Sequence, residues 1–272
     1  MKLSFTIVAL FLTTISLFAE EKPEVEPKGN KGKIYFYWGW NRGSFSNSDI
    51  TFSGANYDFT LRDVVADDRQ SEFDAKTYFA PGNATIPQYN FRIGYFITDN
   101  YNISLGIDHM KYVMRQDQTV KIDGEINNSP TPHDGTYSDG EIQLTEDFLK
   151  FEHTDGLNYA NIAFRRFDEI YEIYKIKISL TEGIGLGILY PRTNTTLLNK
   201  ERYDEFHLAG FGIDAVIGVN FSFLKYFFIQ SELKGGYINM PDIRTTNSES
   251  DKASQDFFFS QIMIVFGASI QI

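Results

Sequence analysis

The feature that most constrains this chain is an alternation of apolar residues with small or polar ones, repeated in segments of roughly ten residues. Alternation with a period of two is typical of a β-strand that has one apolar and one polar face. In residues 207–219, for example, Phe211 and Ile213 alternate with Gly212 and Asp214. Eight segments of this kind are expected as strands: residues 33–41, 88–97, 101–111, 158–166, 174–189, 207–219, 227–236 and 257–272.

The connections between these segments alternate between short and long. Segments two and three, four and five, and six and seven are separated by a few residues each, with turns expected at 98–100, 167–169 and 223–225. The remaining connections, residues 42–86, 115–156, 190–206 and 240–255, are long and polar. Short turns on one side and long loops on the other are typical of membrane β-barrels, whose tilted strands need about 9 to 11 residues to cross.

Large apolar residues on one strand face and small or polar residues on the other fit a wall with lipid outside and a packed lumen inside. Only a closed sheet satisfies its own backbone hydrogen bonds in a bilayer. We therefore predict an all-β fold, a closed antiparallel up-and-down transmembrane β-barrel of eight strands with long extracellular loops. Glu182 falls on the apolar face of its segment, which predicts a bulge or an interface position there.

The two longest loops leave the strand count open. They contain strand-like stretches, residues 49–52, 58–65, 119–126 and 141–152. These stretches could extend the barrel above the membrane as hairpins, or they could make a barrel of ten strands.

The N-terminus predicts export. Lys2 precedes an apolar run over residues 3–18, and Ala19 stands before a polar stretch, as in a cleaved secretory signal peptide. The expected organisation is a signal peptide over 1–19, a short polar segment over 20–32 and a single barrel domain over 33–272. The chain contains no cysteine, which excludes disulfides, a lipid tether and thiolate metal sites.

The formal net charge of −11 makes nucleic acid an unexpected partner. No spacing of residues matches a cofactor motif or a metal site, so we expect neither a cofactor nor a metal. His133, His153 and His207 lie in or beside acidic loops, and we interpret them as solvated loop residues. The carboxylates Asp63, Asp67 and Asp68 leave open a peptidase cluster at the outer rim.

Charged residues on the inward face of the expected strands are candidate lumen residues. They comprise three cations and three anions: Arg92, Asp108, Arg165, Asp214, Glu232 and Lys234. Buried charges must be paired. The plain interpretation is a salt-bridge network that plugs a narrow barrel, and the functional one is a gated path or a proton-linked site.

Two pairs of residues are predicted near the outer boundary of the membrane. Trp38 and Trp40 lie toward the far end of the first strand, where an aromatic girdle is expected. Asp108 and His109 are neighbours on a strand and point to opposite faces, so they cannot form a catalytic dyad without a bulge. We predict no catalytic residue, and we expect His109 and Lys111 to meet lipopolysaccharide phosphates.

In this architecture, residues 33–272 resemble the small eight-stranded outer-membrane β-barrels of the OmpA and OmpX type. The resemblance implies a bacterial outer-membrane location and lipid and lipopolysaccharide as partners. Such barrels usually end on an aromatic residue, whereas this chain alternates correctly over residues 266–272 and ends on Ile272.

The predicted function is a structural or surface-interaction barrel whose long acidic loops meet an extracellular ligand or protein, with a monomer as the expected state. Two alternatives stay open. One is an outer-membrane enzyme acting on lipid A or peptides, which requires a rim cluster of His with Ser or Asp. The other is a narrow, porin-like channel, which requires an open lumen.

Overall fold

The computed structural model describes residues 29–83 and 86–272, and residues 31–272 form one compact unit. The predicted signal peptide, residues 1–19, lies outside the described residues. Among the described residues, no helix is both long enough and apolar enough to cross a bilayer.

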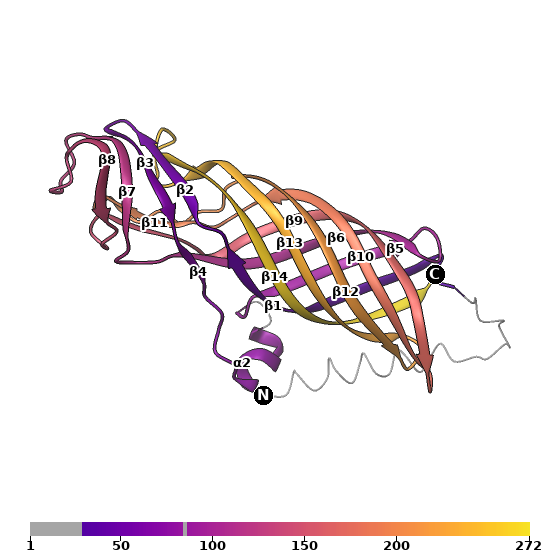
Figure 1. The fold of residues 1–272 in the computed structure, drawn as a ribbon. Coiled ribbons are helices and arrows are strands. Elements are labelled where there is room, and N and C mark those ends of the chain that lie inside the picture. Colours follow the sequence, from indigo (N-terminus) through magenta and orange to yellow (C-terminus); the bar gives the residue numbers. More distant parts are fainter. Residues whose placement is uncertain (1–28, 84–85) are drawn as a thin grey trace. The chain divides into compact units, whose positions relative to one another are not determined.

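Eight antiparallel strands close into a ring (Figure 1). Each strand pairs with the next, and the last pairs with the first from Lys33 opposite Gln271 to Phe45 opposite Phe259. The prediction of eight strands is confirmed, and the ten-strand alternative is wrong. In ring order the strands are β1 (Lys33–Phe45), β5 (Tyr89–Phe96), β6 (Tyr101–Met114), β9 (Leu149–Ile173), β10 (Ile176–Leu189), β12 (Gly210–Phe223), β13 (Phe227–Arg244) and β14 (Lys252–Gln271).

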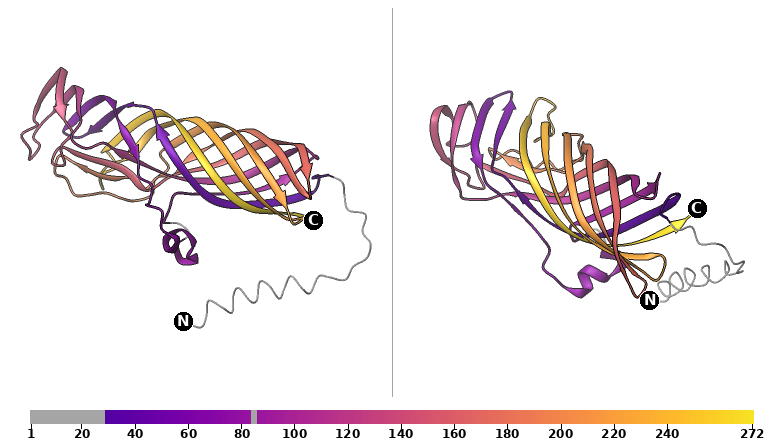
Figure 2. Two further views of the ribbon diagram at one scale, coloured as in Figure 1. Left: turned by 60° about the horizontal axis from the view of Figure 1, so that its bottom comes forward. Right: turned by 45° about the vertical axis from the view of Figure 1, so that its right-hand side comes forward.

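Further strands continue the sheet beyond the end of the barrel that lies opposite the C-terminus (Figures 1 and 2). They continue from β14 in the order β2, β3, β7, β8, while β4 pairs with β6 and β11 pairs with β9. We call this region the extension. Its strands are β2 (Ser48–Gly54), β3 (Tyr57–Val64), β4 (Ala66–Asp68), β7 (Thr119–Ile126), β8 (Gly135–Gln143) and β11 (Asn194–Leu197). The strand-like stretches 49–52, 58–65 and 119–126 therefore lie in hairpins above the ring, whereas the stretch 141–152 is not one strand but covers the end of β8, a turn and the start of β9.

One predicted turn was wrong. The expected turn at residues 167–169 is part of β9, because the ladder to β10 continues through Thr181 opposite Phe167 and Leu180 opposite Asp168. The chain reverses instead at Tyr174 and Lys175, which have φ values of 50° and 75°. Two successive residues with positive φ are characteristic of a tight hairpin turn.

Two smaller expectations are changed by the structure. Glu182 sits opposite Arg166 in an uninterrupted ladder, and the register shift of this strand pair lies between Ile178 and Ser179. A bulge at Glu182 is therefore excluded, and an interface position there stays a prediction. The sixth strand begins at Gly210 rather than at residue 207, so His207 precedes it.

The wall has its apolar side outward. On β6, Ile103, Leu105 and Ile107 are 40–59% exposed, whereas the intervening Ser104 and Asp108 are buried. This distribution is the inverse of that in a water-soluble barrel. A closed ring with an apolar exterior is stable where hydrocarbon surrounds it.

Side chains fill the lumen in three layers. At the end with the short turns lies an aromatic layer, in which Tyr35 contacts Phe96, Phe167 and Phe228 at ring-centroid distances of 5.6–6.4 Å. A layer of charged residues follows. Beyond it an apolar core begins at Tyr159 and Leu189 and continues into the extension, where it includes Phe59 and Phe148.

Candidate functional site

The six charged residues predicted to face the lumen all lie on inward positions of β5, β6, β9, β12 and β13, and each is at most 7% exposed. Arg165 of β9 forms an ion pair with Glu232 of β13. Lys234 of β13 forms an ion pair with Asp108 of β6, and its Nζ lies 3.8 Å from Oδ1 of Asp214 on β12. The structure therefore brings five of the six charges into two ion-paired groups.

Arg92 is held by neutral acceptors instead. Its Nε donates to the Tyr37 hydroxyl at 3.0 Å, and its two terminal nitrogens donate to Ser104 at 3.0 Å and to Asn161 at 2.6 Å. The guanidinium has room because Gly106 lies beside it, and a Cβ there would stand 2.6 Å from a nitrogen of Arg92. A glycine on an inward position thus leaves space for a long side chain from the neighbouring strand.

The network is tied to both adjoining layers. Tyr37 of the aromatic layer donates to Glu232 at 3.4 Å, and Tyr159 of the apolar core donates to Asp214 at 2.9 Å. The charges are therefore enclosed from both ends of the barrel, which gives a substrate no contact with them in this conformation.

His109 is largely enclosed. It is 8% exposed, its Nδ1 lies 2.8 Å from Oδ1 of Asn158, and its ring stacks on Tyr89 at 4.9 Å. Lys111 donates from Nζ to the carbonyl of Ile86 at 3.1 Å. Contact with lipopolysaccharide phosphates stays a prediction for this pair, and little of His109 is available for it.

Trp38 and Trp40 lie on the outward face of β1 with their rings edge to face at 5.0 Å. Trp40 also contacts Tyr78 at 5.4 Å and Phe79 at 5.3 Å, which belong to the helix α2 (Ala75–Phe79). The aromatic contacts at this level therefore extend from the wall into the first long loop.

The other histidines and the acidic loop residues do not converge. Each has its own partner: His133 with Asp147, His207 with Asp242, His153 with Thr193, Asp63 with Asn47, Asp67 with Arg115, and Asp68 with the backbone of Gly43. Within residues 29–83 and 86–272, no group of three or more histidines and carboxylates is placed to hold a metal ion. These contacts do not assemble the rim cluster that a peptidase would need.

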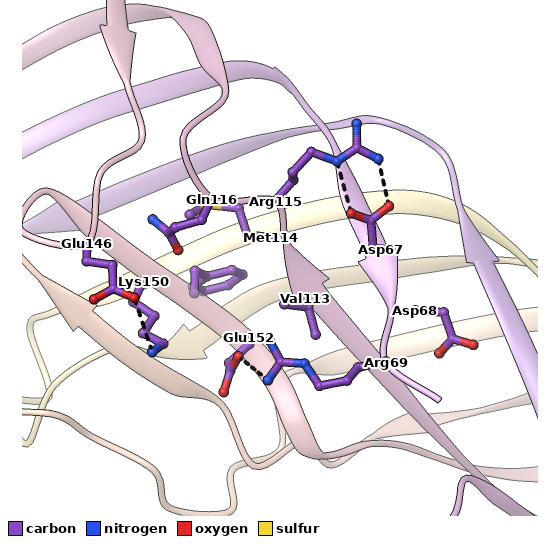
Figure 3. A pocket seen from close by; sticks show the side chains of 11 residues that line it. Asp67, Asp68, Arg69, Val113, Met114, Arg115, Gln116, Glu146, Lys150 and Glu152 are labelled. Atoms are coloured by element: carbon purple, nitrogen blue, oxygen red, sulfur yellow. Dashed lines mark hydrogen bonds and ion pairs between the residues drawn. The ribbon is translucent and has the colours of Figure 1, made fainter. Parts of the chain in front are cut away.

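A cavity of about 330 Å³ opens on the outer wall of the extension (Figure 3). Residues opposite one another in antiparallel strands point to the same face. Val113 of β6 lies opposite Asp67 of β4 and Glu152 of β9, and Glu152 lies opposite Asn194 of β11. These four side chains form one outward row across four strands. An adjoining cavity of about 150 Å³ shares Lys150 and Glu152, and we call the two together the lateral groove.

Paired charges line the lateral groove. Arg115 donates two hydrogen bonds to Asp67, at 2.7 and 2.9 Å, and Arg69 lies 3.0 Å from Glu152 (Figure 3). The hydrogen bonds from Arg115 lower the pKa of the Asp67 carboxyl. The groove thus presents cations and anions side by side over an apolar floor that includes Val113 and Phe151.

Sequence reasoning missed the lateral groove. It named Asp67 only as a loop carboxylate, because β4 is three residues long and its pairing with β6 joins segments about fifty residues apart. A local pattern in the sequence does not predict the pairing of β4 with β6.

Comparison with known proteins gives similarity to solved structures alone: no family model and no curated protein matches the chain. Similar structures include OprG from Pseudomonas aeruginosa, with a TM-score of 0.40, 9% identity and coverage of 90% of this chain and 98% of that one. The outer membrane protein AlkL has a TM-score of 0.39 and 9% identity, and the match covers 93% of this chain and 97% of that one. The outer membrane protease OmpT from Escherichia coli has a TM-score of 0.33 and 8% identity, with coverage of 91% of this chain and 99% of that one.

The wall itself carries the structural conclusion. Its eight strands close on themselves, its exterior is apolar and its lumen is packed with polar and aromatic side chains. The chain is a closed β-barrel with the wall of a membrane-spanning protein.

Proposed function

We propose that this protein is a non-conducting surface-interaction barrel whose lateral groove binds phosphate-bearing oligosaccharide of the surrounding lipopolysaccharide. The observation that carries the proposal is the contrast between a lumen filled in three layers and a cavity that opens on the outer wall of the extension.

The height of the groove supports a saccharide ligand. On β6 the last strongly exposed apolar residue of the wall is Ile107, and Val113 of the groove lies six residues further along the strand. Six residues of strand span about 20 Å. The groove therefore faces sideways above the lipid-facing wall, where the sugars of lipopolysaccharide surround an outer-membrane protein.

The chemistry of the groove fits a charged sugar. Arginine recognises phosphate through two parallel hydrogen bonds, the same geometry in which Arg115 now holds Asp67. Half-exposed ion pairs are worth about 0 to 1 kcal/mol each, so a ligand can compete for them at small cost. The neighbouring carboxylates suit amino groups or bound cations on the same saccharide.

Binding is tested by isothermal titration of the detergent-folded mature protein with delipidated, phosphorylated core oligosaccharide. We expect saturable binding that weakens about tenfold or more, equivalent to about 1.4 kcal/mol, in the double variant Arg115→Gln, Lys150→Gln. Lys121→Gln is the matched control, because it removes an exposed cation of the extension that pairs with Asp139 and Glu141 away from the groove. Equal affinity of the groove variant and this control would refute the assignment of the groove.

The closed lumen is tested separately by single-channel recording in a planar bilayer, with heat-modifiable gel migration to confirm folding. We expect folded protein that inserts without steady conductance steps. A stable, reproducible conductance would refute the non-conducting barrel and support the channel.

A further inference from the structure

The segment between β4 and β5 carries apolar side chains that the rest of the protein leaves uncovered. Within residues 70–83, which we call the belt segment, Phe73 is 72% exposed and Phe79 is 63% exposed. The segment includes α2 and the 3-10 turn η2 (Pro81–Asn83), and Figure 1 shows α2 standing against the side of the barrel rather than above it.

A hydrogen bond joins the belt segment to the wall, and others lie within the segment. Gln70 donates from its side chain to the carbonyl of Asn41 on β1 at 3.0 Å, and Tyr78 donates to the carbonyl of Ser71 at 2.7 Å. Asp74 caps α2 by accepting from the backbone of Thr77 at 2.8 Å. Phe73 and Phe79 therefore lie on a segment that is hydrogen-bonded within itself and joined to β1.

The place of contact is the upper part of the lipid-facing wall. Trp40, which packs against Tyr78 and Phe79, also contacts Phe266 of β14 at 5.8 Å. Phe266 is exposed on the outward face of the wall. The next outward residue of β1 beyond Trp40 is Arg42, a cation. Aromatic residues followed by a cation are typical of the boundary between hydrocarbon and headgroups.

We propose that the belt segment is an interfacial anchor, which places Phe73 and Phe79 among the acyl chains of the outer leaflet, next to Trp40. A phenylalanine side chain is stabilised when it moves from water into an apolar environment. The apolar surface of the segment is continuous with the lipid-facing wall through Trp40, so the lipid that surrounds the wall also covers the segment. The anchor would fix the level of the barrel in the membrane independently of the lateral groove.

The anchor is tested with a single-tryptophan variant. Trp38 and Trp40 are the only tryptophans of the chain, so replacing both by phenylalanine and adding Phe79→Trp leaves one fluorophore in the belt segment. Phenylalanine keeps an aromatic ring at position 40 for the contacts with Tyr78 and residue 79. The folded variant is placed in phospholipid vesicles in which the acyl chains carry bromine. We expect the brominated chains to quench its fluorescence and iodide in the aqueous phase to leave it largely unquenched.

Two variants in the same tryptophan-free background calibrate the result. Leu105→Trp on the lipid-facing side of β6 reports acyl-chain quenching, and Thr136→Trp, at an exposed position of β8 in the extension, reports iodide quenching. Heat-modifiable migration confirms that each variant is folded. If Phe79→Trp behaves as Thr136→Trp does, the belt segment faces water and the proposal fails, whatever the lateral groove binds.

Discussion

At the scale of single residues, the most unusual environment outside the membrane-spanning wall is that of His153. The interpretation of His153 as a solvated loop residue was wrong, because it lies on β9 and is fully buried. Its Nδ1 lies 2.8 Å from the hydroxyl of Thr193, and burial lowers its pKa to about 3. A ring that stays neutral in the folded state but binds a proton in the unfolded state, with a pKa of about 6.5, destabilises the fold as the pH falls below 6.5.

We therefore expect the free energy of unfolding to fall by about 1.4 kcal/mol per pH unit from this residue between about pH 6 and pH 3. The measurement is urea unfolding of the detergent-folded protein at pH 7.5 and at about pH 5, in the wild type and in His153→Gln, which does not titrate. The decrease in the free energy of unfolding from pH 7.5 to about pH 5 should be smaller in the variant. An equal loss in both proteins would show that other groups account for it.

The charged residues of the lumen show which features of a side chain can be predicted from the sequence. In the structure Arg92, Asp108 and Lys234 lie on the inward side of their strands, the side that alternation in the sequence predicts, because successive side chains of a strand point to opposite faces. It could not pair them. Lys234 and Asp108 are 126 residues apart, and they meet only because six further strands close the ring with a particular stagger.

At the scale of elements, the turn between β9 and β10 is formed by residues that do not favour its backbone conformation. Tyr174 and Lys175 both adopt positive φ, which costs a residue with a Cβ about 1–2 kcal/mol. Asparagine and glycine are the residues preferred at these two positions. The sequence gives no such signal here, which explains why the turn was expected at residues 167–169.

The double variant Tyr174→Asn, Lys175→Gly should therefore stabilise the barrel by about 1 kcal/mol or more, seen as a higher midpoint in urea unfolding. The matched control is Lys177→Gly, two residues into β10, where glycine weakens a strand by removing a side chain and adding backbone freedom. Stabilisation by both variants, or by neither, would contradict a role for positive φ at the turn.

Other elements were predictable to different degrees. All eight wall strands were found, because lipid outside and a packed lumen inside impose a strict alternation on them. The hairpins of the extension were recognised as strand-like but left open as wall strands, since β2 and β3 alternate in the same way as a wall strand does. In the structure the apolar residues of β2 and β3, such as Ile50 and Phe59, are buried, whereas those of the wall strands face outward. Alternation alone does not tell which of the two faces is inside.

At the scale of the whole molecule, barrel and extension share one apolar core. The core runs without interruption from Tyr159 and Leu189 at the level of the charged layer to Phe59 of β3, which contacts Phe52 at 5.3 Å and Phe148 at 5.7 Å. A continuous core of this kind predicts that the extension and the barrel unfold together, although the extension consists of segments that the sequence presents as loops.

Phe59→Ala tests this coupling. Truncating a buried phenylalanine costs about 3–5 kcal/mol, and if the core is one unit the loss must lower the temperature at which the barrel itself changes its heat-modifiable migration. Leu208→Ala, at a half-exposed position before β12, is the control and should leave that temperature nearly unchanged. If Phe59→Ala instead made only the extension sensitive to protease, with the barrel transition unaltered, the two regions would be independent. The extension would then be a mobile set of loops rather than a rigid support for the lateral groove.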